Sequence, residues 1–292
     1  MKAIALVNKS SGRGGEEASA RVAGALAQAG IDAEVELISG RDLGERCRAI
    51  AERGDPLLII GGGDGTIGAA AAALAGAVSA IGILPLGTLN HFARDLGIPF
   101  ELEEAAKIIA ANGEHHVDVA EMNGRTFINN SAIGLYPLMV VDRELQRRRR
   151  GRSKRLAMLL ASLRTLARFG HQRLTLTVND QKARVDTPLL FVGNNDYRIE
   201  LPAAGRRRSI ERGELCVMVM RKKTRRGFIA AAVRALFNRS RPDDMVRLDG
   251  VERLRVASGR RQISVSLDGE IVHAAPPLDY KIRKKALRVI AP

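Results

Sequence analysis

Tryptophan is absent from this chain, and aromatic residues of every kind make up only 3% of its 292 residues. Proteins that bind single-stranded nucleic acids set aromatic side chains among basic residues as stacking platforms. The three tyrosines and seven phenylalanines are too few and too scattered for that role, so we expect no nucleic-acid partner. Hydrophobic residues still make up 46% of the chain, and alanine, leucine, isoleucine and valine must build the core.

Cysteine is scarce too, because only Cys47 and Cys216 are present and they lie far apart. Two isolated cysteines offer neither a disulfide framework nor the spacing of a zinc site. We expect two free thiols in a reduced, cytoplasmic protein.

Long hydrophobic runs are missing as well. The first apolar run, residues 3–7, is short and passes directly into Asn8 and Lys9, which indicates a first strand rather than a signal peptide. One uncharged stretch, 66–92, has the length of a membrane span, but it is mostly alanine and glycine and is interrupted by Pro85. A buried helix, a turn and a buried strand account for it better.

Acidic residues are in deficit, with 32 Asp and Glu against 47 Lys and Arg and a net charge of +15. Such an excess calls for a polyanionic partner. Once nucleic acid is set aside, anionic lipid surfaces and phosphorylated small molecules remain.

Two basic segments in the second half carry much of this charge. In residues 147–155, seven of nine are Arg or Lys, and an apolar stripe at helical spacing follows at 156–169. The same pattern recurs at residues 221–226, which are rich in Arg and Lys, and 228–237, which are mostly apolar. A helix packed on a sheet with a solvated charged end would give the same pattern. We favour a peripheral surface facing an anionic membrane, where each Lys or Arg contributes about 1 kcal/mol. Its basic residues are Arg147, Arg148, Arg149, Arg150, Lys154, Arg155, Arg221, Lys222, Lys223, Arg225 and Arg226.

The first 123 residues alternate short apolar runs with helical patterns, which predicts a three-layer parallel-sheet domain with helices on both faces. From residue 124 to 285, short alternating runs predict an antiparallel β-sandwich-like domain. Whether the last strand, 286–292, joins the first domain stays open. In the first half we expect strands at 3–7, 33–38, 57–60 and 81–84, and helices at 16–29, 42–53, 66–76 and 101–112. In the second half we expect strands at 125–129, 173–178, 187–192, 215–220, 245–248, 253–257, 263–267, 270–273, 278–282 and 287–290.

A glycine turn stands between the expected strand 57–60 and the expected helix 66–76. A strand, a glycine turn and a helix N-terminus together form an anion site, because the amides point outward and glycine lets a phosphate approach. The dinucleotide pattern G-x-G-x-x-G is present at 63–68, but no carboxylate follows about 20 residues on to hold a ribose. A Walker A loop is absent. A βα turn without a ligand remains the alternative, as it does for the second glycine-rich turn at 8–15.

Three motifs together carry a resemblance. Gly-Gly-Asp-Gly-Thr at 62–66, Pro-Leu-Gly-Thr-Leu-Asn-His-Phe-Ala-Arg at 85–94 and Leu-Asp-Gly-Glu at 267–270 resemble the diacylglycerol kinase catalytic-domain superfamily, which includes bacterial soluble lipid kinases and sphingosine kinases. The first motif is shared with NAD kinases and phosphofructokinases, whereas the second and third are more specific.

The resemblance implies an ATP- and Mg²⁺-dependent lipid kinase acting on a diacylglycerol-like lipid. Phosphoryl transfer needs cradled phosphates, a metal ion and a base. Glu270 is the preferred base, with Asp268 assisting or binding Mg²⁺, and the reverse assignment stays open. Asp64 is the other candidate metal ligand. An ordinary Asp-Gly hairpin is the alternative for 268–269. The nucleotide-binding residues implied are Asn8, Gly12, Gly61, Gly62, Gly63, Asp64, Gly65, Thr66, Thr88 and Asn90.

The chain departs from the family pattern at several positions. His91 stands where relatives carry an aspartate of the metal network, and we expect a hydrogen-bonding histidine rather than a metal ligand. Arg212 stands where relatives carry an aspartate beside a structural Mg²⁺, so we do not expect that metal here. Lys9 replaces a proline in the first turn. Asp118 matches a family aspartate near the nucleotide, although a solvent-facing strand residue is the alternative.

Two other functions stay open on the sequence: an NAD kinase-like phosphotransferase, and a non-catalytic, nucleotide-binding protein at the membrane. A homodimer is open too. No residue distinguishes diacylglycerol from other lipid alcohols.

Overall fold

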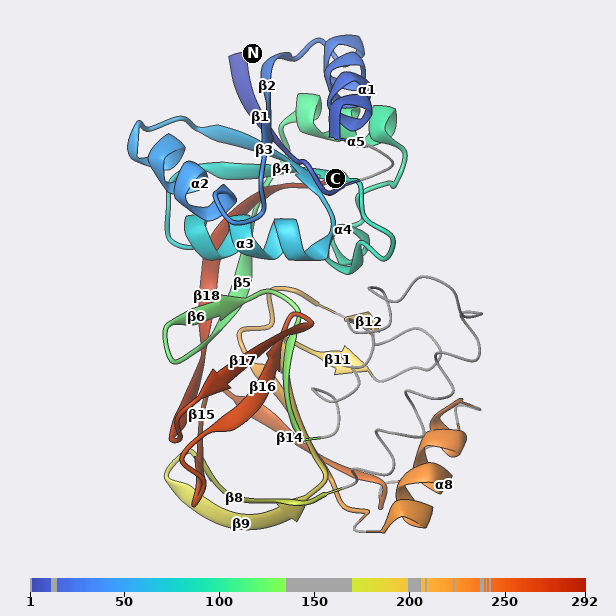
Figure 1. The fold of residues 1–292 in the computed structure, drawn as a ribbon, viewed down its shortest axis with the longest axis vertical. Coiled ribbons are helices and arrows are strands. Elements are labelled where there is room, and N and C mark those ends of the chain that lie inside the picture. Colours follow the sequence, from blue (N-terminus) through green and yellow to red (C-terminus); the bar gives the residue numbers. More distant parts are fainter. Residues whose placement is uncertain are drawn as a thin grey trace.

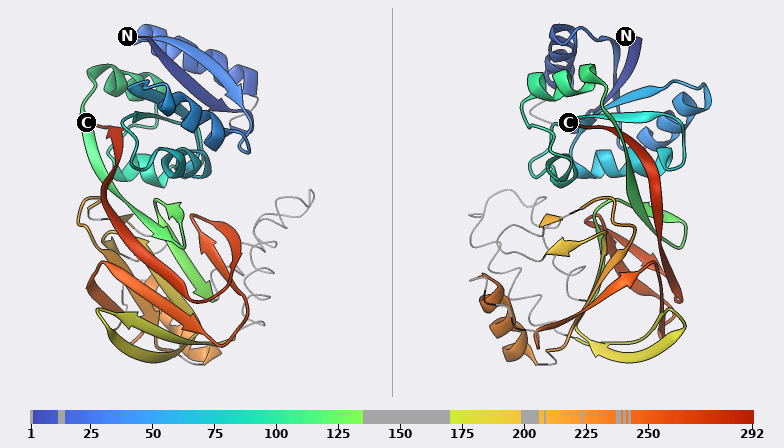
Figure 2. Two further views of the ribbon diagram at one scale, coloured as in Figure 1. Left: turned by 90° about the vertical axis from the view of Figure 1, so that its left-hand side faces the viewer. Right: turned by 180° about the vertical axis from the view of Figure 1, so that it is seen from behind.

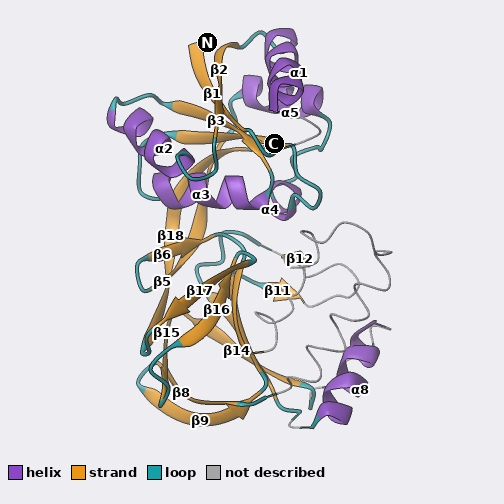
Figure 3. Cartoon of the chain, viewed as in Figure 1, coloured by secondary structure: helices purple, strands orange, loops and turns teal. Residues whose placement is uncertain are grey.

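The computed structural model describes residues 2–11, 15–134, 170–198, 206–207, 209–222, 224–236, 239, 241 and 243–292. The chain folds into an N-terminal half built on a parallel sheet and a second half of antiparallel strands (Figure 1). In the described residues, every helix except α8 (Arg225–Leu236) lies in the first half (Figure 3).

The parallel sheet contains β1 (Lys2–Asn8), β2 (Asp32–Ile38), β3 (Leu57–Gly62) and β4 (Ala80–Pro85), in the order β2-β1-β3-β4. Every residue of β3 and β4 is buried, as expected for strands covered on both faces. Two pairs of helices flank the sheet (Figure 2). Helix α1 (Gly15–Gln28) packs beside α5 (Leu102–Ala111), and α2 (Leu43–Glu52) packs beside α3 (Asp64–Leu74).

Two strands run from one half into the other (Figure 1). Strand β5 (Glu114–Met122) pairs antiparallel with β18 (Leu278–Ile290), and the end of β18 pairs in parallel with β4. The strands expected at 278–282 and 287–290 are therefore one strand, which a bulge interrupts between Arg283 and Leu287. The predicted boundary at residue 123 falls in the turn between β5 and β6 (Arg125–Phe127).

The second half is a sandwich of two antiparallel sheets. On one side, β18 continues into β15 (Arg253–Ser258), β8 (Gln172–Val178) and β9 (Gln181–Thr187). The facing sheet has the order β14-β13-β10-β7-β16-β17. Its strands are β7 (Asn130–Gly134), β10 (Leu189–Asn194), β13 (Leu215–Met220), β14 (Met245–Val251), β16 (Ile263–Leu267) and β17 (Glu270–Ala274).

The core of the sandwich takes buried side chains from both sheets, such as Leu176 and Leu254 on one and Val192 and Val265 on the other. The fold class predicted from the sequence is thereby confirmed. The sequence did not predict strand β9, because its first four residues are exposed, polar or small, and show no alternation of apolar and polar side chains.

The two cysteines are buried and unbonded, and burial raises the pKa of the Cys47 thiol to about 12. Among the described helices, none has the length and apolar character needed to cross a membrane.

Candidate active site

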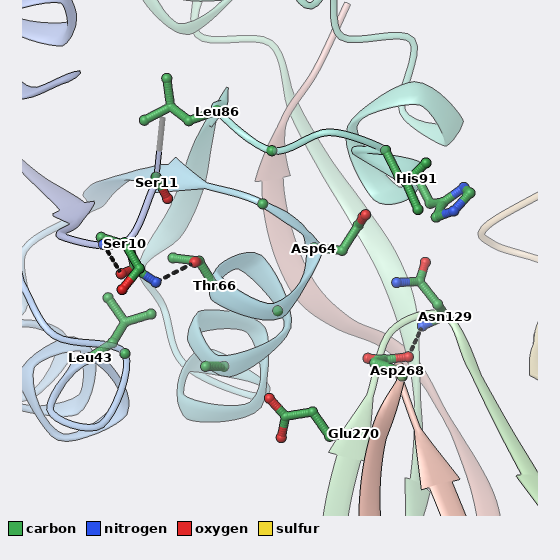
Figure 4. A pocket seen from close by; sticks show the side chains of 18 of the residues that line it. Ser10, Ser11, Leu43, Asp64, Thr66, Leu86, His91, Asn129, Asp268 and Glu270 are labelled. Carbon is green, nitrogen blue, oxygen red and sulfur yellow. Dashed lines mark hydrogen bonds between the residues drawn. The ribbon is translucent and has the colours of Figure 1, made fainter. Parts of the chain in front are cut away.

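One cavity of about 1750 Å³ lies between the two halves. The carboxyl ends of the parallel strands supply one side, as usual in open α/β sheets, and the turn between β16 and β17 supplies part of the other (Figure 4). Of the predicted nucleotide, metal and catalytic residues, those that line the cavity are Asn8, Gly63, Asp64, Gly65, Thr66, Thr88, Asp268 and Glu270. Gly61, Gly62 and Asn90 lie outside the lining, and Gly12 lies outside the described residues.

The glycine turn opens α3 toward this cavity. Gly63 is the N-cap of α3 in an extended conformation, and its carbonyl oxygen accepts the amides of Thr66 and Ile67. The amides before Thr66 in the first helical turn have no partner within the helix, and the helix dipole adds positive potential there. The turn therefore presents donors to an anion, as the sequence predicted for a phosphate.

A second turn packs against the glycine turn, backbone on backbone. A Cβ atom on Gly87 would lie 2.5 Å from the Cα of Gly63 and 2.6 Å from the Oδ1 of Asn90. Asn90, which has a left-handed φ of 46°, accepts the amide of Gly87 and donates to its carbonyl oxygen, both at 3.0 Å. The buried Asn90 thus shapes the turn that carries Thr88.

We expect Gly87→Ala to weaken nucleotide binding at least about tenfold and to cost about 1–3 kcal/mol of stability, because the added methyl forces the two turns apart. Isothermal titration with ATP and thermal unfolding measure both effects. Gly24→Ala is the matched control, because Gly24 lies within α1 with open space around it. Unchanged affinity in Gly87→Ala would contradict the close packing of the turns.

Asn8 connects the first turn to α3. Its Nδ2 donates to the Oγ1 of Thr66 at 2.8 Å, and its Oδ1 accepts the amide of Ser10 at 2.9 Å. Asp64 connects α3 to α4 (His91–Asp95), since its Oδ1 accepts the amide of Phe92 at 3.1 Å. The other carboxylate oxygen of Asp64 stays available at the cavity, and oxygen is the ligand that Mg²⁺ prefers.

Asp268 and Gly269 form the two-residue turn of the β16–β17 hairpin. Their φ angles are 47° and 86°, and Leu267 pairs with Glu270 across the turn, as in a tight hairpin with two left-handed residues. Residues 268–269 therefore form an Asp-Gly hairpin turn. Asp268 lies in the turn and Glu270 begins β17, and both residues line the cavity.

The Asp268 carboxylate is bonded to the main chain. Its Oδ2 accepts the amide of Ile128 at 2.8 Å, and its Oδ1 accepts those of Asn129 at 2.8 Å and Asn130 at 3.0 Å (Figure 4). Burial raises the pKa of Asp268 to about 6, and these three amides and the charge of Arg207 oppose the rise. Asp268 therefore anchors the turn 128–130.

Glu270 differs from Asp268 in its exposure and in its hydrogen bonding. It is exposed at the start of β17, and its side chain extends into the cavity (Figure 4). No described residue forms a hydrogen bond or ion pair with its carboxylate. Glu270 is thus free to accept a proton from a bound hydroxyl.

His91 lines the same cavity and contacts Arg94 through its Nδ1, at 3.0 Å from Nη2. A guanidinium only donates, so Nδ1 is the acceptor and the neutral ring carries its proton on Nε2. Where relatives are expected to hold an aspartate, this chain places a hydrogen-bonding imidazole.

The comparison with known proteins agrees with the first two of the three motifs, which lie within the matched residues. The family model of the diacylglycerol kinase catalytic domain matches residues 2–122. The match begins with β1 and ends with β5, so it covers the first half of the chain. A segment of 81 residues is 47% identical to the "Probable lipid kinase YegS-like" of Citrobacter koseri, and the match covers 26% of this chain and 27% of the relative. The matched segment thus spans about a quarter of the relative's length.

Solved structures share the fold over both halves. A diacylglycerol kinase from Bacillus anthracis superposes with a TM-score of 0.73 at 22% identity, covering 100% of this chain and 97% of the other. Yeast NADH kinase superposes with a TM-score of 0.57 at 13% identity, covering 100% and 84%. At these identities the likeness concerns the fold alone.

Two residues compared with the family pattern, Arg212 and Asp118, lie outside the cavity lining. Arg212 donates to the Oδ2 of Asp196 at 2.9 Å and lies 2.7 Å from the Oε1 of Glu214, so a guanidinium already neutralises these carboxylates. Asp118 is buried and accepts the amides of Gly213 and Lys285, both at 2.7 Å. The solvent-facing alternative for Asp118 is wrong, and the residue fixes the β18 bulge from outside the cavity lining.

Several lining residues were not predicted, including Ser39, Arg41, Asp95, Asn129 and Tyr197. Ser39 and Arg41 follow the carboxyl end of β2, and that position is the one signal that reasoning from strand ends offers. Nothing in the sequence marks Asn129 or Tyr197.

The predicted lipid surface is described only in part. Arg147–Arg150, Lys154, Arg155 and Lys223 lie outside the described residues. Arg221, Arg225 and Arg226 are exposed, and Ile229 on α8 is 41% exposed among them. Lys222 is paired instead, 3.7 Å from Asp244.

Proposed function

We propose that the protein is an ATP-dependent kinase that transfers a γ-phosphate to a hydroxyl of a diacylglycerol-like lipid. One observation carries the proposal: the N-terminus of α3, Asp64 and Glu270 line a single cavity although more than 200 residues separate the first from the last. A phosphate cradle and an exposed carboxylate facing it are the parts that phosphoryl transfer requires of a protein.

Each group has a defined task in this mechanism. The amides of Gly63, Asp64 and Gly65 bind the phosphates, and the Glu270 carboxylate accepts the proton as the hydroxyl oxygen bonds to the γ-phosphorus. The bond from that phosphorus to the β–γ bridging oxygen breaks, and ADP leaves. Mg²⁺ would neutralise the phosphate charge, held by Asp64 and phosphate oxygens, since Mg²⁺ takes few protein carboxylates. No described cluster of three acidic, histidine or cysteine residues offers a separate metal cage.

The test is incubation with γ-labelled ATP, Mg²⁺ and a total lipid extract, followed by identification of the labelled product. We expect label in a phosphorylated lipid. Label in NADP after addition of NAD would instead support the NAD kinase alternative, and ATP binding without any transfer would support the non-catalytic one.

We also propose that the protein reaches its lipid by reversible binding to anionic membranes through the basic surface around α8 and the segment 147–155. The exposed Arg221, Arg225 and Arg226 and the exposed Ile229 support this, because charge attraction and shallow apolar insertion add up at an interface.

We expect co-sedimentation with phosphatidylcholine vesicles only when phosphatidylglycerol is included, and at least about a tenfold loss for Arg221→Glu/Arg226→Glu, from roughly 1 kcal/mol per basic residue. Replacing Arg147–Arg150 by alanine tests the other segment. Arg21→Glu/Arg48→Glu is the control, since it changes the net charge equally on exposed positions of α1 and α2. Binding that ignores lipid charge, or an equal loss in the control, would refute the surface.

A further inference from the structure

A buried arginine spans the two halves beside the cavity. Arg207 lies in β12 (Arg206–Arg207), which pairs with β11 (Tyr197–Arg198), and its side chain is 0% exposed. A guanidinium removed from water must be paired and fully hydrogen-bonded, or it destabilises the fold by several kcal/mol. The contacts of Arg207 therefore show what this position requires.

One set of contacts reaches the first half. The Nε of Arg207 donates to the Oδ2 of Asp95 at 2.7 Å, and its Cζ lies 5.4 Å from the ring centre of Phe92. Both partners belong to α4, and the Phe92 amide is the group that Asp64 binds. Tyr197 covers the guanidinium from the second half, with its ring centre also 5.4 Å away, in the geometry of a cation–π contact.

The other set of contacts reaches the turn that Asp268 anchors. Nη1 of Arg207 donates to the carbonyl oxygen of Ile128 at 2.5 Å, and Nη2 donates to the Oδ1 of Asn129 at 3.2 Å. The amides of the same turn bind Asp268. Arg207 thus binds acceptors of this turn while Asp268 binds its amides, and the two buried charges together fix it. Glu270 follows Asp268 by two residues.

Strands β11 and β12 lie below α4, on the opposite side of the molecule from β5 and β18 (Figure 1), and Tyr197 of β11 lines the cavity. The two connecting strands alone would leave this side of the cavity free to open. We propose that Arg207 is a positioning residue that ties α4 to the turn 128–130 and so fixes the separation between the α3 phosphate cradle and Glu270. This inference rests on the proposed kinase function.

Arginine is required at this position because its fork donates to Asp95, to a main-chain carbonyl and to Asn129 together. Lysine carries the same charge on one compact ammonium group and cannot donate to all three acceptors at once. A change of about 1 Å in the separation of reacting groups costs on the order of 100-fold in rate. The loss should fall on kcat, because the phosphate cradle lies wholly within the first half.

The experiment compares Arg207→Met, Arg207→Lys and Asp95→Asn with the wild type. We expect kcat for lipid phosphorylation to fall about 100-fold in each, with the Kd for ATP within about twofold. Hydrogen exchange should accelerate in two separate segments, 91–95 and 127–131. Arg288→Lys is the matched control, because Arg288 makes a bidentate pair with Glu114 and a bond to the Val78 carbonyl, and it should leave both kcat and those segments unchanged.

Three outcomes would overturn the inference: full kcat in Arg207→Lys, a kcat loss no greater than the loss of folded protein, or faster exchange in only one of the two segments. Exchange is measured without turnover. A wild-type protein that phosphorylates no lipid would therefore refute the proposed function, while the exchange pattern would still decide whether Arg207 ties the halves together.

Discussion

Glu270→Gln should lower kcat for phosphoryl transfer by about 10²–10⁴-fold, the usual contribution of a general base, while the Kd for ATP changes by no more than about twofold. Glutamine keeps the size and the hydrogen-bonding oxygen of the side chain but does not accept a proton at neutral pH. The fold should not suffer, because Glu270 is exposed at the start of β17 and bonds to no described residue.

Single-turnover assays with γ-labelled ATP separate the chemical step from nucleotide binding, which calorimetry measures independently. Glu103→Gln is the control, since Glu103 is an exposed carboxylate on α5 outside the cavity lining. Turnover near the wild-type level in Glu270→Gln would remove Glu270 from the mechanism and favour the reverse assignment to Asp268.

The glycine turn at the N-terminus of α3 was predictable because its cause is local. Four consecutive apolar residues, three glycines and a following helical pattern determine a strand, a turn and a helix N-terminus without reference to the rest of the chain. The convergence of Asp64 and Glu270 on one cavity was predictable only through the resemblance. The rule that ligands bind at the carboxyl ends of parallel strands locates Asp64, but it says nothing of a hairpin in the other half.

The remaining parts of the site depend on contacts that no periodicity encodes. Arg207 lies within three consecutive arginines, a pattern typical of a solvated surface, and its burial follows from Asp95, Phe92 and Tyr197 in distant elements. The resemblance implied that Asp268 assists the base or binds Mg²⁺, and it left open whether Asp268 is itself the base. Its three main-chain bonds arise from the turn 128–130, which is remote in sequence.

Asp268→Ala should lower the free energy of unfolding by about 2–4 kcal/mol at neutral pH and abolish transfer while the folded protein still binds ATP. Three amides lose their acceptor, and each unpaired buried donor costs about 1–3 kcal/mol, partly offset because a buried charge is also removed. Transfer is lost because the turn 128–130 and the hairpin that carries Glu270 are held together through this carboxylate.

The pH dependence of this effect has a definite sign. Because the pKa of Asp268 is raised from 3.8 to about 6 in the folded protein, its protonated form favours folding. Its contribution is fully present below the unfolded pKa and is lost as the pH rises through about 6. Urea unfolding of wild type and Asp268→Ala should therefore show a stability difference that grows by about 2.4 kcal/mol from pH 7 to pH 4, at 1.36 kcal/mol per pKa unit. Other titrating groups cancel in the difference. A difference that shrinks on acidification would mean that the three amide bonds outweigh burial and hold the carboxylate ionised.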